Sequence, residues 1–267
     1  MIDVDVKKID DIIRHVAKTE VLPRHKNLKE GDFREKNPDD FVTIADEESE
    51  RVLTELLAEA LPGSIVVGEE AVAKNPAVLE HLSGDAPVWV VDPIDGTYNF
   101  LHGRRYFGIL VALVHKGETL YGWGYDVPGD RMAFARRGGG AFLDGTPLQV
   151  TCSAANMGEL RGVAGGAQPW HFKGVSKHVD SVINLRCSLH DFLHFLTGEV
   201  DFILHVGVSK PWDHAAGCLI VEEAGGYVAV KDGDPYSPLL HERAFILTAP
   251  SREWWEEMAP MMRQAMR

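Results

Sequence analysis

Short apolar runs of strand length alternate, along the whole chain, with longer segments whose apolar residues have helical spacing. The first four runs occupy residues 64–67, 88–91, 108–115 and 120–125. They predict strands of a largely buried sheet, and turn signals at 128–130 and 144–145 predict hairpins after them. Because helices and strands interleave and no internal repeat is present, the sequence predicts a mixed, layered fold with one main core.

Two segments ahead of the first strand have helical spacing. One spans residues 4–21, and the other starts near Asp46 and ends at Pro62-Gly63. Between them, residues 23–38 are polar and charged, which predicts a mobile loop. Lys36 lies in this loop, and we expect it either to be solvated or to approach a metal cleft formed by acidic residues described below.

The second half of the chain has a different pattern, beginning with an irregular glycine-rich segment near residues 162–166. After it, the spacing predicts a helix, a strand, a helix and two further strands, at residues 189–196, 200–204, 213–224, 227–230 and 244–247. Gly225-Gly226 is a typical helix C-cap. Ser251 is a candidate cap for a last helix, which Pro260 is expected to bend or shorten.

The charge balance limits the partners of the chain. It has 40 Asp and Glu against 27 Lys and Arg, a net charge of −13, which disfavours nucleic acid and anionic membranes as partners. No apolar run reaches the ~18 residues of a membrane helix, and residues 1–8 are charged, unlike a signal peptide. The three cysteines are odd in number and widely spaced, as in a reduced, cytoplasmic protein.

The segment from Trp89 to Thr97 is the most informative motif. A buried strand runs into Asp92 and Asp95, and Pro93 fixes the turn between them. Gly96-Thr97 then offers backbone N–H groups to phosphate oxygens. Two acids for metal beside two amides for phosphate suit metal-assisted phosphoryl transfer. The alternative interpretation is an ordinary Asp-Pro turn with an aspartate N-cap.

Further acids stand at the ends of other elements. Glu69 follows Gly68 at the end of a strand, and we expect its neighbour Glu70 to be solvated. Asp213 heads the predicted helix 213–224, where an aspartate is also an ordinary N-cap. Thr43-Ile-Ala-Asp46 is fully explained as a capping box. Glu69, Asp92, Asp95 and Asp213 together form an all-oxygen set that suits Mg²⁺.

The motifs Gly68-Glu-Glu70, Asp92-Pro-Ile-Asp-Gly-Thr97 and Trp212-Asp-His-Ala-Ala-Gly217 resemble those of the inositol monophosphatase family. This is a superfamily of magnesium-dependent, lithium-sensitive phosphatases. Supporting matches are Thr43-Ile-Ala-Asp46, Arg137-Gly-Gly-Gly-Ala-Phe142 and Val221-Glu-Glu-Ala-Gly-Gly226. The resemblance implies an α-β-α-β-α layered sandwich, of mixed α+β and α/β character, that usually forms a homodimer.

The resemblance also implies a role for each matching residue. Glu69, Asp92 and the carbonyl of Ile94 would hold one Mg²⁺, and Glu69 with water would hold a looser third ion. Asp92, Asp95 and Asp213 would hold the second. Gly96 and Thr97 would bind the phosphate. The Thr97 hydroxyl, paired with Asp46, would orient or deprotonate the attacking water, which makes Asp46, Glu69 and Thr97 the expected catalytic residues.

The substrate side departs from the family pattern. Members that hydrolyse inositol phosphates have Gly-Ser/Thr-Ala where this chain has Arg186-Cys187-Ser188, and a glutamate where it has His205. We expect Arg186, Ser188 and His205 to contact the substrate and to change which alcohol fits. Arg186 either meets a second phosphate or carboxylate, or points to solvent, or pairs with Asp191 or a partner subunit.

The sequence thus predicts a Mg²⁺-dependent phosphomonoesterase acting on a small phosphorylated alcohol, such as an inositol or sugar phosphate. Histidinol-phosphate or 3′-nucleotide phosphatase is the alternative within the superfamily. A non-catalytic phosphate-binding regulatory protein is the alternative from another class, and the intact acids and Thr97 argue against it. We expect one unit over residues 1–267, with metal and phosphate residues in roughly 1–150 and substrate residues in 151–267.

Overall fold

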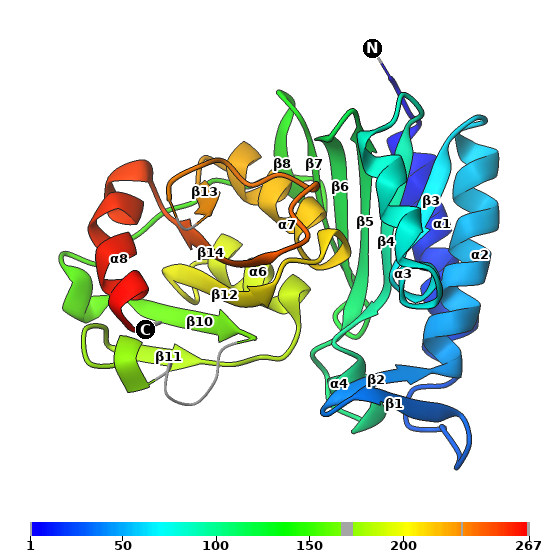
Figure 1. The fold of residues 1–267 in the computed structure, drawn as a ribbon, viewed down its shortest axis with the longest axis horizontal. Helices are drawn as coiled ribbons and strands as arrows, with labels where there is room; N and C mark the ends of the chain where they lie inside the picture. Colours follow the sequence, from blue (N-terminus) through cyan, green and yellow to red (C-terminus); the bar gives the residue numbers. More distant parts are fainter. Residues whose placement is uncertain (1, 167–172, 231, 266–267) are drawn as a thin grey trace.

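The computed structural model describes residues 2–166, 173–230 and 232–265. Figure 1 shows five layers in the order helices, sheet, helices, sheet, helix. α1 (Val6–Val16) and α2 (Ile44–Ala60) cover one face of the first sheet. α6 (Ser188–Leu196) and α7 (Pro211–Glu223) lie between the two sheets, and α8 (Arg252–Ala265) covers the far face of the second. The α-β-α-β-α sandwich predicted from the sequence is confirmed.

The first sheet has seven strands within the described residues, in the order β3-β4-β5-β6-β7-β8-β9. The strands are β3 (Ile65–Gly68), β4 (Val88–Asp95), β5 (Gly108–His115), β6 (Glu118–Asp126), β7 (Arg131–Arg136), β8 (Gly140–Leu143) and β9 (Thr146–Pro147). β3 and β4 are parallel, and each later pair is antiparallel. β4 and β5 are buried along almost their whole length because helices cover both faces.

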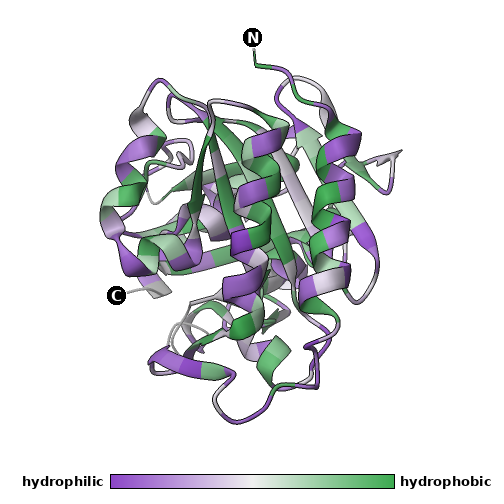
Figure 2. Ribbon diagram, turned by 90° about the vertical axis from the view of Figure 1, so that its right-hand side faces the viewer, coloured by the Kyte–Doolittle hydropathy of each residue, from purple (hydrophilic) through white to green (hydrophobic). Residues whose placement is uncertain are grey.

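The two outer helices pack on this sheet through one apolar face each. Ile9, Ile13 and Val16 of α1 and Leu53 and Leu57 of α2 are buried in a core that includes strand residues. Figure 2, which looks onto these two helices, shows hydrophilic positions facing outward and hydrophobic strands behind them. The predicted helix at 4–21 is α1 continued by a π-helical turn, Ala17–Val21.

The second sheet has five strands in the described part of the chain, in the order β11-β10-β12-β14-β13. They are β10 (Arg161–Gly165), β11 (Ser181–Ile183), β12 (Phe202–Val208), β13 (Tyr227–Val230) and β14 (Arg243–Ala249). The prediction of an irregular segment at 162–166 is therefore wrong for 162–165. This strand has a glycine at position 162 because a Cβ there would lie 2.0 Å from the ring of Phe202, which fills that space.

Two further expectations about elements need correction. Residues 23–38 are not all loop: β1 (Phe33–Asn37) pairs with β2 (Asp40–Thr43) as a hairpin whose turn residue Asp39 has a φ of 64°. The expectation that Pro260 shortens the last helix is wrong, because α8 continues through it, and a bend at Pro260 stays a prediction. The cap of α8 is confirmed, since the Trp254 N–H donates to Ser251 Oγ.

The remaining short elements connect the sheets and helices. They are α3 (Glu69–Lys74), α4 (Thr97–Leu101) and the 3₁₀ segments Pro76–Ser83 and Met157–Glu159. Among the residues that the structure describes, no helix has the length and apolar character needed to cross a membrane.

Candidate functional site

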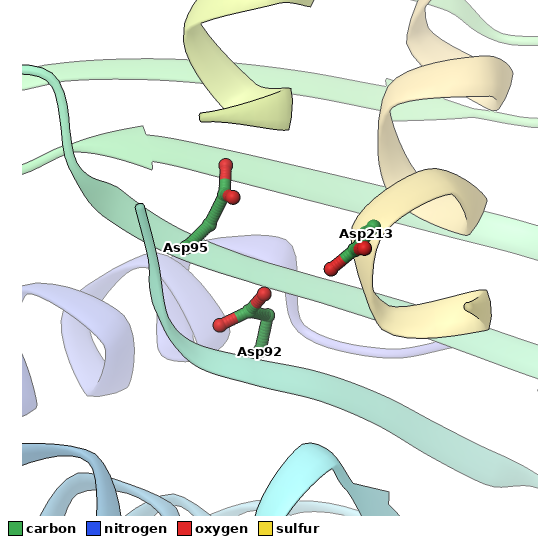
Figure 3. Close-up of side chains that lie close together, drawn as sticks. All are labelled: Asp92, Asp95 and Asp213. Atoms are coloured by element: carbon green, nitrogen blue, oxygen red, sulfur yellow. The ribbon is translucent and has the colours of Figure 1, made fainter. Parts of the chain in front are cut away.

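The ends of β3 and β4 meet the first turns of α6 and α7 around a cavity of about 410 Å³. Figure 3 shows the side chains of Asp92 and Asp95 of β4 close to that of Asp213 on α7. One carboxylate oxygen from each residue lies within 4.8 Å of the others. The fold thus brings Asp92 and Asp95 next to Asp213, although at least 118 residues separate them from it in the sequence.

The backbone of β4 explains why both of its aspartates reach the cavity. The pairing of β4 with β5 shifts register between Asp92 and Asp95, so the strand does not alternate regularly there. Asp92 Oδ1 accepts a hydrogen bond from the N–H of Ile94 at 3.1 Å, which closes a tight turn around Pro93. The turn predicted from Asp-Pro therefore aims the two carboxylates at the same space.

Asp95 also anchors the first turn of α6. Its carboxylate accepts hydrogen bonds from the N–H groups of Ser188, at 3.1 Å, and Leu189. The thiol of Cys187 lies 3.1 Å from the same carboxylate. Because the N-cap residue Cys187 makes no side-chain cap, Asp95 satisfies these N–H groups from another element.

Burial makes the charged form of these acids costly. Burial raises the pKa of Asp92 well above its usual value, and the charges of Glu69, Asp95 and Asp213 raise it further. The pKa of Asp95 rises to about 7 through burial and the charge of Asp213. A cation would relieve this repulsion, and oxygen-only donors suit a hard divalent ion. The residues present therefore fit a divalent metal ion.

Glu69, the first residue of α3, lines the same cavity. Lys36 Nζ lies 2.9 Å from its carboxylate and 3.1 Å from that of Glu70. Lys36 thus approaches the acidic cleft. Burial lowers the pKa of Lys36, but the charges of Glu69 and Glu70 raise it by more, so the net effect is a raised pKa. The expectation that Glu70 is solvated is wrong: it is 2% exposed, because Lys36 neutralises it inside the protein.

Thr97 connects β4 to α2. Its hydroxyl lies 3.0 Å from Asp46 Oδ1 and 2.9 Å from the carbonyl oxygen of Ile94, and it donates to this pair. The other oxygen of Asp46 accepts from the N–H of Thr43, and the N–H of Asp46 donates to Thr43 Oγ1, which confirms the predicted capping box; the Thr43 hydroxyl also donates to the same carboxylate oxygen. Burial raises the pKa of Asp46 to about 7, against the lowering effect of the bond from Thr43.

Gly96 precedes Thr97 with a φ of 85°, which disfavours other residues. A Cβ at this position would lie 2.7 Å from the carbonyl oxygen of Tyr106 and 3.1 Å from the Cβ of Cys187. The glycine therefore allows both the left-handed turn and the close packing beside the cavity.

Arg186 stands at the rim of the cavity. Its guanidinium lies 4.0 Å from the ring centroid of Tyr98 and 3.7 Å from a carboxylate oxygen of Asp39. The alternative pairing with Asp191 is not made, because Asp191 bonds to His205 instead. Ser188 lines the cavity next to it.

His205 of β12 and Asp191 of α6 form a buried pair that lines the same cavity. His205 Nε2 lies 3.0 Å from Asp191 Oδ2, while His205 Nδ1 and Asp191 Oδ1 are buried without a hydrogen-bond partner among the described residues. Burial lowers the pKa of His205 to about 4, so its imidazole is neutral at pH 7. Both residues line the cavity, and buried polar atoms without a hydrogen-bond partner are uncommon in folded proteins.

A family model described as the inositol monophosphatase family matches residues 2–267. The chain belongs to the inositol monophosphatase family. It is 33% identical to inositol-1-monophosphatase of Mesorhizobium japonicum over 209 residues, 74% of this chain and 75% of that protein. It is 30% identical to inositol-1-monophosphatase of Bacillus subtilis over 212 residues, 75% of this chain and 76% of that protein.

The structure of Thermotoga maritima IMPase aligns with a TM-score of 0.83 at 25% identity, covering 98% of each chain. The family predicted from the three motifs is thus confirmed, and so is its fold. Inositol monophosphatase family proteins are phosphoric monoester hydrolases, and this member is a phosphatase.

Sequence reasoning gave no role to two residues that this inositol monophosphatase family member places at the site. Lys210 lines the cavity, and its ammonium group lies 5.8 Å from the ring centroid of Trp212. The charge of Asp213 raises its pKa, although burial opposes this. Glu50 contacts α3 from α2. Its place one helical turn after Asp46 was the available signal.

Proposed function

We propose that this phosphatase is a Mg²⁺-dependent phosphomonoesterase acting on a small phosphorylated alcohol. The observation that carries the proposal is the cluster of Asp92, Asp95 and Asp213, with carboxylate oxygens within 4.8 Å of one another beside Gly96 and Thr97. Three buried acids at one point are unfavourable without a cation. Beside a glycine turn that exposes backbone amides, they support phosphate chemistry.

The metal ligands of the proposal are the residues named by the family motifs. Asp92, Asp95 and Asp213 would hold one ion. Glu69, Asp92 and the carbonyl of Ile94 would hold another. When bound, such ions lower the pKa of a coordinated water and neutralise charge on the phosphoryl group.

The chain's own residues position the reactants. The N–H groups of Gly96 and Thr97 would donate to phosphate oxygens. Thr97 Oγ1 directs its proton toward Asp46 and Ile94, so its lone pairs are free to accept a hydrogen bond from water. Thr97 and Asp46 would thereby orient the attacking water, and no protein nucleophile is required.

The alcohol half of the substrate would contact Arg186, Ser188 and His205. A neutral His205 with a free Nδ1 can bond to a hydroxyl, and Arg186 can meet a second anionic group. Because curated relatives are named inositol-1-monophosphatase, inositol phosphate is the first substrate to test. Sugar phosphates, histidinol phosphate and 3′-nucleotides complete the panel.

Release of phosphate from this panel, with and without Mg²⁺, tests the proposal. We expect Mg²⁺-dependent release from at least one small phosphorylated alcohol, loss of release with a chelator, and none from Asp213→Asn. Arg131→Gln, an exposed change on β7, is the matched control and should retain activity. Release that persists in metal-free protein would contradict metal dependence. No release from any compound would instead favour a phosphate-binding protein.

Lithium inhibition and a homodimer, which the family resemblance implies, also belong to the proposal, as does the cytoplasmic location expected from the cysteines. Li⁺ added to the same assay should reduce turnover. Light scattering should give twice the chain mass of 29.5 kDa. An unchanged rate with Li⁺, or a single-chain mass, would contradict these two points.

A further inference from the structure

Glu50 is a buried acid that the proposed chemistry does not use. It lies on the buried stripe of α2, one turn after Asp46, and is 8% exposed. Its two carboxylate oxygens accept hydrogen bonds from the N–H groups of Glu70 and Ala71, each at 2.8 Å. Among the described residues, no cation forms an ion pair with it within 4.0 Å. Burying a carboxylate that only backbone amides contact costs free energy of folding, so we ask what these two hydrogen bonds provide.

These bonds fix the start of α3. The helix has only six residues, and its N-cap residue Gly68 provides no side-chain cap. N–H groups in a first helical turn lack partners within their own helix. Glu50 supplies those partners from α2. Because Glu70 and Ala71 directly follow Glu69, the same bonds hold the backbone that carries the Glu69 carboxylate to the cavity.

Gly68 provides an independent observation. A Cβ at this position would lie 2.2 Å from Glu50 Oε2 and 2.3 Å from its carboxyl carbon. The φ of Gly68 is −99° with a ψ of 158°, an extended conformation that any residue adopts. The backbone therefore does not require glycine here. What glycine provides is the space that the Glu50 carboxylate occupies.

We propose that Glu50 is a positioning residue that fixes Glu69 for binding a divalent cation. α2 then holds both parts of the site, since Asp46 contacts Thr97 and Glu50 holds the turn that carries Glu69. The inference rests on the metal dependence proposed above, and it adds a residue that touches neither metal nor substrate.

Glu50→Gln is the direct test. The amide keeps the shape of the side chain but has one acceptor oxygen in place of two, so one of the two bonds to α3 is lost. We expect the affinity of metal-free protein for Mg²⁺ or Mn²⁺, measured by calorimetric titration without substrate, to fall roughly 10- to 100-fold. Glu55→Gln is the control, an exposed change on the same helix that removes only the charge of the ion pair with Arg51. Its affinity should equal that of the wild type.

A second pair of variants separates positioning from stability. Glu50→Ala removes both bonds and leaves a cavity, and Gly68→Ala in that background adds a methyl group where the carboxylate stood. We expect the double variant to regain melting temperature over Glu50→Ala while its divalent affinity stays low. If Glu50→Gln does not fold, this comparison takes its place.

The outcomes separate the two proposals. Unchanged divalent affinity in Glu50→Gln, or affinity that returns with stability in the double variant, would contradict the positioning role alone. A wild-type protein that binds neither Mg²⁺ nor Mn²⁺ would contradict the proposed metal dependence and this inference together.

Discussion

At the scale of single residues, Asp92 is the acid for which burial and neighbouring charges act together against ionisation. Burial raises its pKa first, and the charges of Glu69, Asp95, Asp213 and Asp46 raise it further. Such a group is retained for what it binds and not for the stability that it gives to the fold.

Asp92→Asn should therefore abolish turnover with little unfolding. Loss of a residue that only supports a metal ligand lowers activity by up to about 100-fold. Asp92 is proposed to bind the metal directly, so we expect the rate to fall by at least that factor. The melting temperature of the metal-free variant should equal or exceed that of the wild type, because a neutral amide removes repulsion. Phosphate-release assays and calorimetry measure the two effects. Retained activity would remove Asp92 from the site.

Thr97 offers a second test at this scale. Thr97→Val keeps the shape of the side chain but removes the hydroxyl that contacts Asp46 and Ile94. If this hydroxyl orients the attacking water, kcat should fall roughly 10²- to 10⁴-fold. Thr97→Ser keeps the hydroxyl and should retain most of the activity. Equal loss in both variants would mean that the methyl group, and not the hydroxyl, matters.

The sequence predicted the cavity acids because each follows a strand or heads a helix within a short motif. It did not predict the partners of Glu70 and Glu50, which are distant from them in the chain. Glu70 was expected in solvent, yet its partner Lys36 is 34 residues away. Glu50 bonds to N–H groups 20 and 21 residues ahead. Such contacts exist only in the folded chain, where β1 and α2 lie beside α3.

At the scale of elements, the errors concern strands that lack an apolar pattern. β1, Phe33–Asn37, is charged and mostly exposed, so its pairing with β2 leaves no trace in hydropathy. β10, Arg161–Gly165, contains glycines because its neighbours occupy the space of side chains. Helices with one apolar face and buried strands were predicted well, because their burial follows directly from periodicity.

The segment between β11 and α6 should control substrate choice. Arg186 in this segment has a φ of 55°, a conformation that glycine adopts readily. Replacing Arg186 by glycine therefore keeps the backbone conformation but removes the stacking of the guanidinium on Tyr98. We expect Arg186→Gly to change the ratios of kcat/KM across the substrate panel far more than kcat on a generic aryl phosphate. Ratios that equal those of the wild type would exclude Arg186 from substrate selection.

At the scale of the whole molecule, the two sheets and the helices between them form a shared core. Residues of β4 and β5 belong to the same buried cluster as residues of α6, α7 and β12. The acids lie at the edge of this core, where elements from both sheets end. The division into halves at about residue 150 stays a prediction.

This placement makes stability depend on pH. Burial raises the pKa values of Asp46 and Asp95 to about 7, against about 3.9 for an unfolded aspartate. The metal-free folded protein therefore binds these protons more tightly than the unfolded chain. Their contribution favours folding at acid pH and is lost as the pH rises from about 4 through about 7.

The proposed divalent cation would bind the deprotonated form of Asp95, so it should counter the part of that loss that comes from Asp95. We expect Mg²⁺ to raise the melting temperature more at about pH 8 than at about pH 5.5. Scanning calorimetry at both pH values, with and without Mg²⁺, measures this difference. An equal or larger increase at the lower pH would contradict the pKa values assigned to these acids.

The central claim is that Asp92, Asp95 and Asp213 bind a divalent cation next to the phosphate. Anomalous diffraction from a crystal grown with Mn²⁺ and inorganic phosphate tests it most directly. We predict an anomalous peak bonded to oxygens of all three carboxylates, with phosphate oxygens on the N–H groups of Gly96 and Thr97. Carboxylates that stay without a peak in a crystal containing both ions would contradict the claim.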